Sequence, residues 1–540
     1  MGYAHEYAAA VMRRGRVPME PADFVPDWAD RPRKGKHFTG AEHFPLPDGM
    51  VAPAATVQRG LHGPGGDGGF TLELLGGMLR DSYGLTGRRL AVQANSDLGS
   101  LPLATHANYS RGTASGGGLY PIGVHWVCGG SGPLAPGVYH YATGQHAVQR
   151  LLAGDVSDRV GAALGGFGPA TDQYLVLGVK FWQNAFKYNS FAYHVVAMDI
   201  GALLATWRIW AGAHGLRIAP AFWFDERRIG QLLGMAPEQE GVFAVVPLRW
   251  QGGAGRPARP VAPESVRVRA TDQERSRRVL EFETVQRVHA ATLAGATERP
   301  APPALAAALA AATDPAPGGP ALALPAPAPL TADVRTALRA RRSSFGRFTG
   351  RPPISVEQLS TALAAAAAAG RLDSDTECPP SGGPGTPPLT RLYVFVNHVA
   401  GLTPGSYRYQ PADHTLQLLH PGAPGAFLQQ NYFLANYNLE QAGAMILAAT
   451  PTGAVLDALG DRALRLVNAT VGAVSQALYT AAAAAGLACG VALGFDCVSY
   501  AEHLALGDPS SGPLDGEIPM LIMMIGREQR AAADFDHRIA

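Results

Sequence analysis

Apolar residues recur along the first half of the chain at spacings that separate helices from strands. Residues 70–84 and 200–214 have helical spacing, and Gly215 stands where a helix would end. Alternating or continuous apolar runs predict strands over residues 120–128, 138–141, 174–181 and 242–250. Because helices and strands mix without a strict βαβ rhythm, the pattern favours an α+β fold.

The second half carries one clear helix start and one long uncharged run. Ser355 and Gln358 are spaced as a capping box, so we predict a helix that begins there and ends at Gly370. Residues 466–495 carry no charge and include a turn at Gly486. The run also holds Asn, Gln, Ser and Thr, so we predict a buried helix rather than a membrane span.

The stretch between the halves has its own composition. Residues 271–274 read TDQE, a second capping-box pattern, ahead of an amphipathic run with apolar residues from Val279 to Val288. Residues 296–329 are rich in Ala and Pro, which predicts a semi-rigid spacer.

The sequence repeats itself. Residues 136–152 read PGVYHYATGQHAVQRLL and residues 404–420 read PGSYRYQPADHTLQLLH. Upstream and downstream, three further pairs recur in the same order: Ser115-Gly116-Gly117 with Ser381-Gly382-Gly383, Gly215-Leu216 with Gly486-Leu487, and Phe224-Asp225 with Phe495-Asp496. Their near-constant spacing predicts two tandem copies of one domain.

The repeat divides the 540 residues into five segments. We expect a lead-in (1–50), a first copy (51–255), a connector of one helix and the Ala/Pro stretch (256–330), a second copy (331–530) and a tail (531–540). Each copy is long enough to bury its own core. Charged residues make up 16% of the chain, against about 25% in typical domains, which predicts a large buried interface between the copies.

Composition excludes several classes of protein. The net charge is +1 and no long basic run occurs, so we expect no nucleic-acid partner. Four cysteines without a CxxC, and histidines without ligand spacing, predict no metal site and fit a reducing cytoplasm. The first residues lack the apolar core of a signal peptide, so we expect a cytoplasmic protein with no membrane partner.

The strongest polar cluster is RRSSFGRF at residues 341–348. Its guanidinium and hydroxyl groups could grip a phosphate, since arginine offers paired donors. The candidates are Arg341, Arg342, Ser343 and Arg347. A solvated basic helix end remains the alternative.

Several motifs resemble a known family. RRSSFGRF followed by PPISVEQLS resembles the opening of FMN-dependent nitroreductase-fold enzymes. SGGGLYP at 115–121, then PGVYHY, then Lys187-Tyr188 resemble the azoline dehydrogenases of that fold, the SagB/McbC type, which convert thiazolines and oxazolines of peptides into thiazoles and oxazoles. The lead-in residues 27–32 (DWADRP) are similar to theirs. The resemblance covers most of the chain outside the connector.

The resemblance implies an obligate dimer with FMN at the interface, which here would be a pseudo-dimer of two nitroreductase-like domains within one chain. The second copy keeps the phosphate grip, Gly494 beside the flavin and Arg527 as a further cation. The first copy has Trp223 where Gly494 stands and only Arg59 in the region of the grip. A glycine lets the backbone approach a flavin edge, whereas an indole would fill that space.

The first copy supplies what the second lacks. It carries Lys187 and Tyr188, where the second copy has Ala458-Leu459, and its Ser115, Gly116 and Gly117 would reach the flavin held by the other copy. The losses are complementary, so one complete site and one FMN per chain are expected.

The implied reaction removes two hydrogens from an azoline ring of a precursor peptide, one as a proton and one as a hydride to the flavin. Tyr188, or Lys187 through it, would be the general base, because a nearby cation favours phenolate. Oxygen would reoxidise the flavin. The family also suggests a cyclodehydratase as a partner.

Three other interpretations stay open. The chain could be a nitro- or quinone reductase that uses NAD(P)H, or a flavin-free scaffold that binds a precursor peptide or a cyclodehydratase. Lys187-Tyr188 could be an ordinary surface pair next to a helix.

Overall fold

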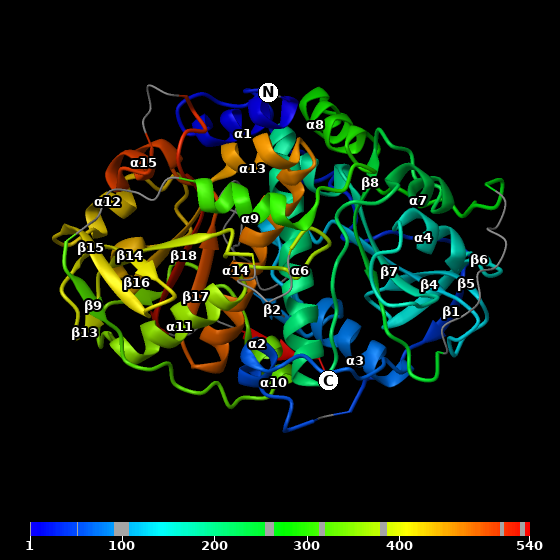
Figure 1. The fold of residues 1–540 in the computed structure, drawn as a ribbon, viewed down its shortest axis with the longest axis horizontal. Coiled ribbons are helices and arrows are strands. Elements are labelled where there is room, and N and C mark those ends of the chain that lie inside the picture. Colours follow the sequence, from blue (N-terminus) through cyan, green and yellow to red (C-terminus); the bar gives the residue numbers. More distant parts are fainter. Residues whose placement is uncertain are drawn as a thin grey trace.

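Two β-sheets lie on either side of a central pair of long helices (Figure 1). The computed structural model describes residues 2–50, 52–90, 107–253, 264–312, 319–377, 386–507, 512–529 and 535–539. The central helices are α6 (Ala192–Ala213) and α14 (Ala463–Ala484), and nearly all their side chains are buried. They pack directly on each other, so the core runs continuously from one half of the molecule to the other.

The first sheet has six antiparallel strands in the order β1-β6-β5-β4-β7-β8. The strands are β1 (Glu42–Pro45), β4 (Ile122–Cys128), β5 (Gly137–Ala142), β6 (Ala147–Ala153), β7 (Gln173–Lys180) and β8 (Glu240–Pro247). One face packs on α6 and on α3 (Leu72–Tyr83), and the other packs under α4 (Ser157–Ala163) and α7 (Glu226–Leu232). The strands predicted over 120–250 and the helix predicted over 70–84 are therefore confirmed.

The second sheet runs in the order β10-β18-β16-β12-β14-β15-β9, with β17 also paired to β18. The strands are β9 (Ala321–Ala323), β10 (Phe348–Thr349), β12 (Arg391–Val396), β14 (Gly405–Gln410), β15 (Thr415–Pro421), β16 (Ala444–Thr450), β17 (Ala488–Ala492) and β18 (Ile518–Glu528). Its faces pack on α11 (Val356–Ala368) and α14, and on α12 (Gly425–Gln430) and α15 (Cys497–Leu504). Read from β9 to β18, the strand order matches that of the first sheet.

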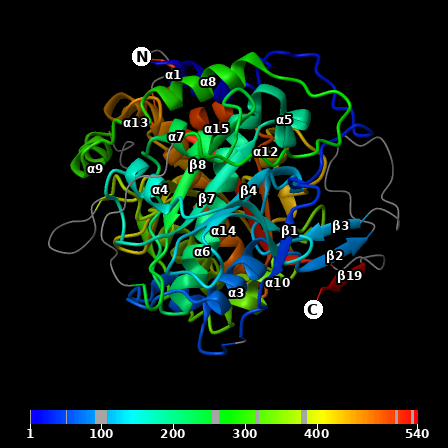
Figure 2. The ribbon, with the colours of Figure 1, turned by 90° about the vertical axis from the view of Figure 1, so that its right-hand side faces the viewer.

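The remaining elements join and cap the two halves. A three-stranded sheet of β19 (Phe535–Arg538), β2 (Gly87–Leu90) and β3 (Ala107–Ser110) joins the C-terminal strand to the first half (Figure 2). β11 (Ile354–Ser355) pairs with β13 (Val399–Ala400). The other helices are α1 (Tyr3–Arg13), α2 (Val57–His62), η1 (Gly116–Gly118), α5 (Trp182–Tyr188), η2 (Asn189–Phe191), α8 (Glu283–Ala294), α9 (Pro302–Ala311), α10 (Val334–Ala340), η3 (Leu439–Gln441) and α13 (Thr452–Leu459).

The repeated tyrosines and histidines make the same hydrogen bonds in both halves. The Tyr141 hydroxyl lies 2.9 Å from His146 Nδ1, and the Tyr409 hydroxyl lies 2.8 Å from His414 Nδ1. Both histidines have positive φ, 47° and 50°, at the turn of a hairpin. Both second ring nitrogens bond a proline carbonyl oxygen, at 3.0 and 3.1 Å, from Pro47 and Pro325 respectively. Hairpin geometry therefore accounts for the repeated PGxYxY and His.

The two central helices meet through reciprocal glycines. A Cβ added at Gly201 would lie 1.7 Å from the Ala469 carbonyl oxygen, and one at Gly472 would lie 1.9 Å from the Met198 carbonyl oxygen. Met198 and Gly201 are related to Ala469 and Gly472 by the offset that separates Gly215 from Gly486. Such paired contacts are the pattern of a two-fold interface.

Two expectations about the connector are wrong. No helix begins at residues 271–274, because Asp272 and Glu274 instead bind Lys180 Nζ, at 2.6 and 2.8 Å, and α8 begins at Glu283. The Ala/Pro stretch is more than a spacer, since it forms α9 and adds β9 to the edge of the second sheet. In contrast, the capping box of Ser355 and Gln358 and the buried helix before Gly486 are confirmed. Ser381-Gly382-Gly383 lies outside the described residues.

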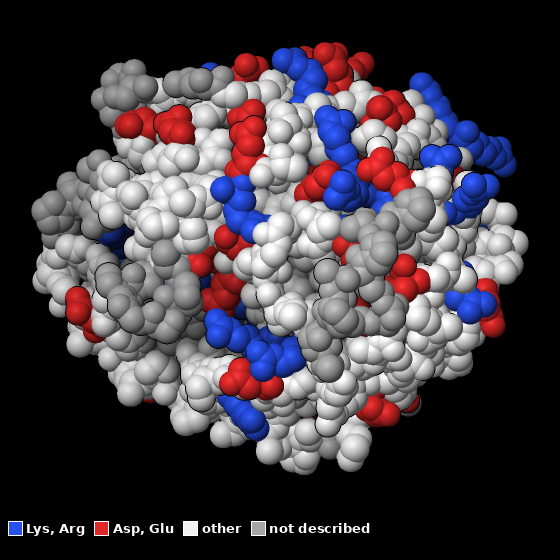
Figure 3. Space-filling view, turned by 45° about the vertical axis from the view of Figure 1, so that its right-hand side comes forward, with Lys and Arg blue, Asp and Glu red and all other residues white. Residues whose placement is uncertain are grey.

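The most apolar helical run is buried, and charged side chains of both signs lie on the surface. Among the described residues, Trp182–Ala213 is one run apolar and long enough to cross a membrane, yet most of it is buried between the sheets. On the face drawn in Figure 3, basic and acidic side chains lie interspersed. That face therefore presents no large patch of one sign.

Candidate functional site

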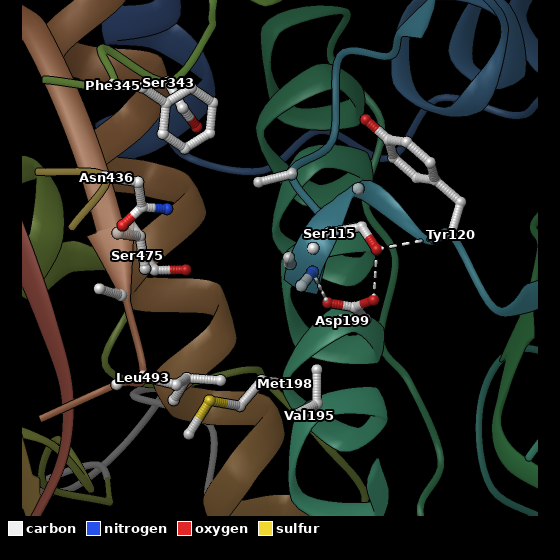
Figure 4. Close-up of a pocket in the computed structure, with 18 of the residues that line it drawn as sticks. Ser115, Tyr120, Val195, Met198, Asp199, Ser343, Phe345, Asn436, Ser475 and Leu493 are labelled. Carbon is white, nitrogen blue, oxygen red and sulfur yellow. Dashed lines mark hydrogen bonds between the residues drawn. The ribbon is translucent and has the colours of Figure 1, made fainter. Parts of the chain in front are cut away.

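A cavity of about 500 Å³ lies between the two halves (Figure 4). The first half contributes α6 and the loop that contains η1, and the second contributes α14, residues 341–345, the 432–437 loop and β17. Met198 and Leu493 line one end, and Ser343, Phe345 and Asn436 line the other (Figure 4). The cavity is thus built jointly by segments far apart in the sequence.

Most of the residues singled out from the sequence meet in this cavity. Its lining includes Ser115, Gly116, Gly117, Lys187, Tyr188, Arg341, Arg342, Ser343 and Gly494. Arg347 and Arg527 are not among the residues that line it. Both lie by the end of β18, where Arg527 is paired in register with Thr349 of β10.

The glycine loop, residues 115–118, is held in place by a carboxyl group that sequence reasoning missed. Ser115 Oγ donates to Asp199 Oδ2 at 2.6 Å, and the Gly116 N–H donates to Asp199 Oδ1 at 2.8 Å. Ser115 Oγ also accepts from the Tyr120 N–H at 2.9 Å, as the dashed lines in Figure 4 show. Asp199 therefore fixes the loop against α6.

Asp199 is itself chemically unusual. Burial raises its pKa to about 7, although the Ser115 and Gly116 donors act in the opposite direction. The carboxyl group therefore changes charge close to neutral pH. An acid within an otherwise apolar helix was the signal available in the sequence.

Lys187 and Tyr188 end α5 and pack on the glycine loop. Gly117 has φ 61°, and a Cβ added there would lie 2.8 Å from Tyr188 Oη and 3.2 Å from Lys187 Nζ. Lys187 Nζ is 4.8 Å from the centre of the Tyr188 ring and 5.8 Å from that of Trp28. Gly117 is thus required twice, by its backbone conformation and by the close approach of the pair.

Arg341 links the two halves. Its Nε donates to the Gly112 carbonyl at 2.7 Å and its Nη2 donates to the Arg111 carbonyl at 2.8 Å. The guanidinium lies 5.2 Å from the centre of the Tyr479 ring, and Tyr479 also bonds Ser343 through the two hydroxyls at 2.7 Å. Two donor groups of Arg341, Nε and Nη2, are therefore already engaged by backbone carbonyls of the protein itself.

The Glu528 carboxylate, which sequence reasoning missed, lies close to Arg342 and Arg347. Glu528 Oε2 lies 3.2 Å from Arg342 Nη2 and accepts from Ser344 Oγ at 3.2 Å, while Glu528 Oε1 lies 3.6 Å from Arg347 Nη1. Glu528 directly follows Arg527 at the end of β18. It offsets part of the positive charge expected for the phosphate grip.

The lead-in reaches the cavity as well. Arg14, directly after α1, lines it, donates to the Leu493 carbonyl, and places its guanidinium 4.6 Å from the centre of the Phe191 ring. Lys34 lines it too. Both lie in the basic RRGR and RPRKGK runs of the lead-in, which sequence reasoning left without a role.

The corresponding place in the other half is filled. Asp375 accepts from the Phe222 and Trp223 N–H groups at 2.9 and 3.0 Å. Arg299 donates to Asp375 at 3.1 Å and to the Trp223 carbonyl at 2.8 Å. Phe222 and Trp223 correspond to Leu493 and Gly494 in the repeat, and Leu493 and Gly494 line the cavity. In the first half, the Asp375 carboxylate and the Arg299 guanidinium therefore occupy the equivalent position.

The lining fits a flavin mononucleotide. Volumes of about 300–1,000 Å³ with apolar walls and a few placed polar groups are typical of cofactor sites. Val195, Met198 and Leu493 supply apolar surface, and Ser343 supplies a donor at the opposite end (Figure 4). Arg342, next to Ser343 in the chain, also lines the cavity and offers further donors. Gly117 and Gly494 line the cavity from opposite halves, where an added Cβ would meet Tyr188 and Leu434 respectively.

The chain has a nitroreductase-like α+β fold with a cavity shared by its two halves. The family model described as "Nitroreductase family" matches residues 338–527. A solved structure from Anabaena variabilis, classed as a nitroreductase, is 21% identical with a TM-score of 0.71. The match covers 98% of this chain and 100% of that one. At this identity the likeness shows the fold.

Other matches are partial. A protein from Ralstonia eutropha classed as a nitroreductase is 23% identical, with a TM-score of 0.28, over 41% of this chain and 96% of that one. The E. coli microcin synthetase McbBCD complex with truncated pro-MccB17 bound is 15% identical, with a TM-score of 0.28, over 35% of this chain and 70% of that one. No curated protein matches the chain.

Proposed function

We propose that the chain is an FMN-dependent azoline dehydrogenase of the SagB/McbC type, built as a pseudo-dimer of two tandem copies (51–255 and 331–530) with one FMN. One observation carries the proposal. The glycine loop and Lys187-Tyr188 of the first half face residues 341–345 and Gly494 of the second across one cavity. Precursor-peptide binding, a cyclodehydratase partner and a cytoplasmic location belong to the same proposal.

Each half would hold a different part of FMN. Arg342 and Ser343, with Arg341 beside them, would bind the phosphate. Arg347 would support them through Glu528, which it shares with Arg342, and Arg527 would be a further cation. Ser115, Gly116 and Gly117 would approach the ring from the first half, and Gly494 from the second. FMN supplies the hydride acceptor when it is bound.

Lys187 and Tyr188 would handle the proton. Oxidation of a thiazoline or oxazoline releases one proton and one hydride from the ring, so a base must stand close to the hydride acceptor. The Tyr188 hydroxyl and the Lys187 ammonium both face Gly117 in the cavity, and the ammonium lies 4.8 Å from the centre of the Tyr188 ring. Met198, Val195 and Phe191 add apolar lining to the same cavity.

Anaerobic reduction tests the assignment. A peptide that contains a thiazoline should bleach the bound flavin within seconds to minutes and lose the mass of two hydrogens for each ring oxidised. NADPH should bleach it far more slowly. Rapid bleaching by NADPH, with none by the peptide, would instead assign a nitro- or quinone reductase.

A further inference from the structure

A second cavity, of about 310 Å³, adjoins the first. Residues 33–37 of the lead-in, Arg111, His140 of β5 and the hairpin at 143–145 line it. Lys34 lines both cavities. A molecule in the first cavity could therefore extend a group into the second.

The second cavity is lined by cations without matching acids. In the described part of the chain its lining holds Arg33, Lys34, Lys36 and Arg111, and neither Asp nor Glu. Lys36 is paired with Glu240. Arg33 donates to a carbonyl, that of Gln273, at 2.9 Å. Arg33, Lys34 and Arg111 thus leave positive charge that no carboxylate of the described residues neutralises.

Arg111 is the fixed part of the site. It is 4% exposed, and its guanidinium lies 4.3 and 4.1 Å from the centres of the Tyr83 and Tyr120 rings. Its Nη2 donates to the Lys34 carbonyl at 3.1 Å, while its Nε has no hydrogen-bond partner. Arg111 therefore holds a fixed guanidinium charge in the wall of the second cavity.

Lys34 is the movable part. It is open to solvent within the hollow but surrounded by protein, and burial, followed by Arg111, Arg31 and Lys187, lowers its pKa to about 8. These cations repel one another, and a bound anion would offset the repulsion.

The wall also carries histidine and glutamine side chains. Burial lowers the pKa of His140 to about 4, so the ring is uncharged at pH 7. Its Nδ1 lies 3.4 Å from Gln149 Oε1, and Gln149 Nε2 lies 2.9 Å from His43 Nε2. The His140 ring therefore adds a hydrogen-bonding group without adding charge at pH 7.

We propose that this second cavity binds an oxyanion, a carboxylate or a phosphate, that belongs to the molecule whose reacting part lies in the first cavity. The inference rests on the proposed function for the identity of that molecule. In a peptide substrate the oxyanion would be an acidic side chain or the C-terminal carboxylate. In a nicotinamide nucleotide it would be a phosphate.

Phosphate binding to the flavin-loaded protein tests the site without turnover. Calorimetric titration with inorganic phosphate should show that Lys34→Gln and Arg33→Gln each weaken binding by about tenfold. Arg287→Gln, a control with the same charge change on the exposed side of α8, should bind phosphate as the wild type does. Equal affinities in all four proteins would overturn the proposal.

Competition then identifies the source of the anion. Displacement of phosphate by a short peptide with a free carboxylate, but not by its amide, assigns a peptide group. Displacement by NADP⁺ assigns a nucleotide phosphate. If the protein takes up no FMN, the proposed function fails, and the same titration on the protein as purified still decides whether the anion site exists.

Discussion

Lys187, Tyr188 and Asp199 surround the glycine loop, and their side chains determine the chemistry that the shared cavity can support. Asp199 holds Ser115 and Gly116 in place, and the loop in turn packs on the Lys187-Tyr188 pair. The pair could be proposed from the sequence because it matched a family motif. Asp199 stood out only as an acid within a mostly apolar helix, and its role could not be proposed because Ser115 and Gly116 lie more than eighty positions away in the chain.

Tyr188→Phe and Lys187→Ala should each lower azoline turnover by about 100-fold or more, because they remove the proposed base or the cation beside it. Both variants should still bind FMN, since neither residue is among the proposed phosphate ligands. Turnover and flavin absorbance measure the two effects separately. Tyr3→Phe, on the N-terminal helix, is the control. Wild-type turnover by either variant with FMN bound would remove the pair from catalysis.

Asp199 should make stability depend on pH in a defined direction. Its pKa rises from 3.8 to about 7 on folding, so the folded protein keeps a proton that the unfolded chain has released. Stability should therefore fall as pH rises from about 4 to 7. Each pKa unit corresponds to about 1.4 kcal/mol, so between pH 5 and pH 8 this group costs up to about 3 kcal/mol.

Asp199→Asn tests this directly, because an amide has no charge to lose. Between pH 5 and pH 8 the melting temperature should fall less in the variant than in the wild type. Parallel pH profiles would show that Asp199 is ionised throughout this range in the folded protein.

The helices and hairpins explain which sequence patterns were reliable. Ser355 and Gln358 form the expected capping box because both side chains bond the backbone of their own helix. The TDQE pattern failed because Lys180, a residue distant in sequence, takes its carboxylates. Local patterns predicted elements well wherever no distant charge competed for the same side chains.

Substitutions at the crossing of α6 and α14 should be severe. Gly201→Ala or Gly472→Ala would place a methyl group within 2 Å of a backbone carbonyl, so the helices must separate. We expect a loss of about 2–4 kcal/mol and weaker FMN binding, because the cavity spans both helices. Gly230→Ala in α7 is the matched control, because nothing lies within 4 Å of its added Cβ. It should be neutral or stabilising. Equal melting temperatures for the three variants would contradict this reading of the helix contact.

The whole molecule is asymmetric although its strand order repeats. The repeat predicted two related halves because hairpin residues such as Tyr141 and His146 recur with their partners. Trp223 and Gly494 already distinguished the copies in the sequence. Asp375 and Arg299 could not be anticipated, since they reach the first half from the second half and the connector.

Asp375→Ala should separate structure from cofactor binding. It leaves the N–H groups of Phe222 and Trp223 and the Arg299 guanidinium without their acceptor, at a cost of about 1–3 kcal/mol. The melting temperature should fall while the amount of FMN per chain stays the same. A gain of a second flavin would show that Asp375 blocks an otherwise competent site.

The ratio of FMN to protein tests the central claim, that one site is assembled from complementary halves. The absorption spectrum of the purified chain, with the released flavin quantified, measures it. We expect a yellow protein with about one FMN per chain, and Arg342→Ala should lower that ratio. A ratio near two would contradict the asymmetric pseudo-dimer, and a colourless protein that cannot be reconstituted with FMN would contradict the proposed function.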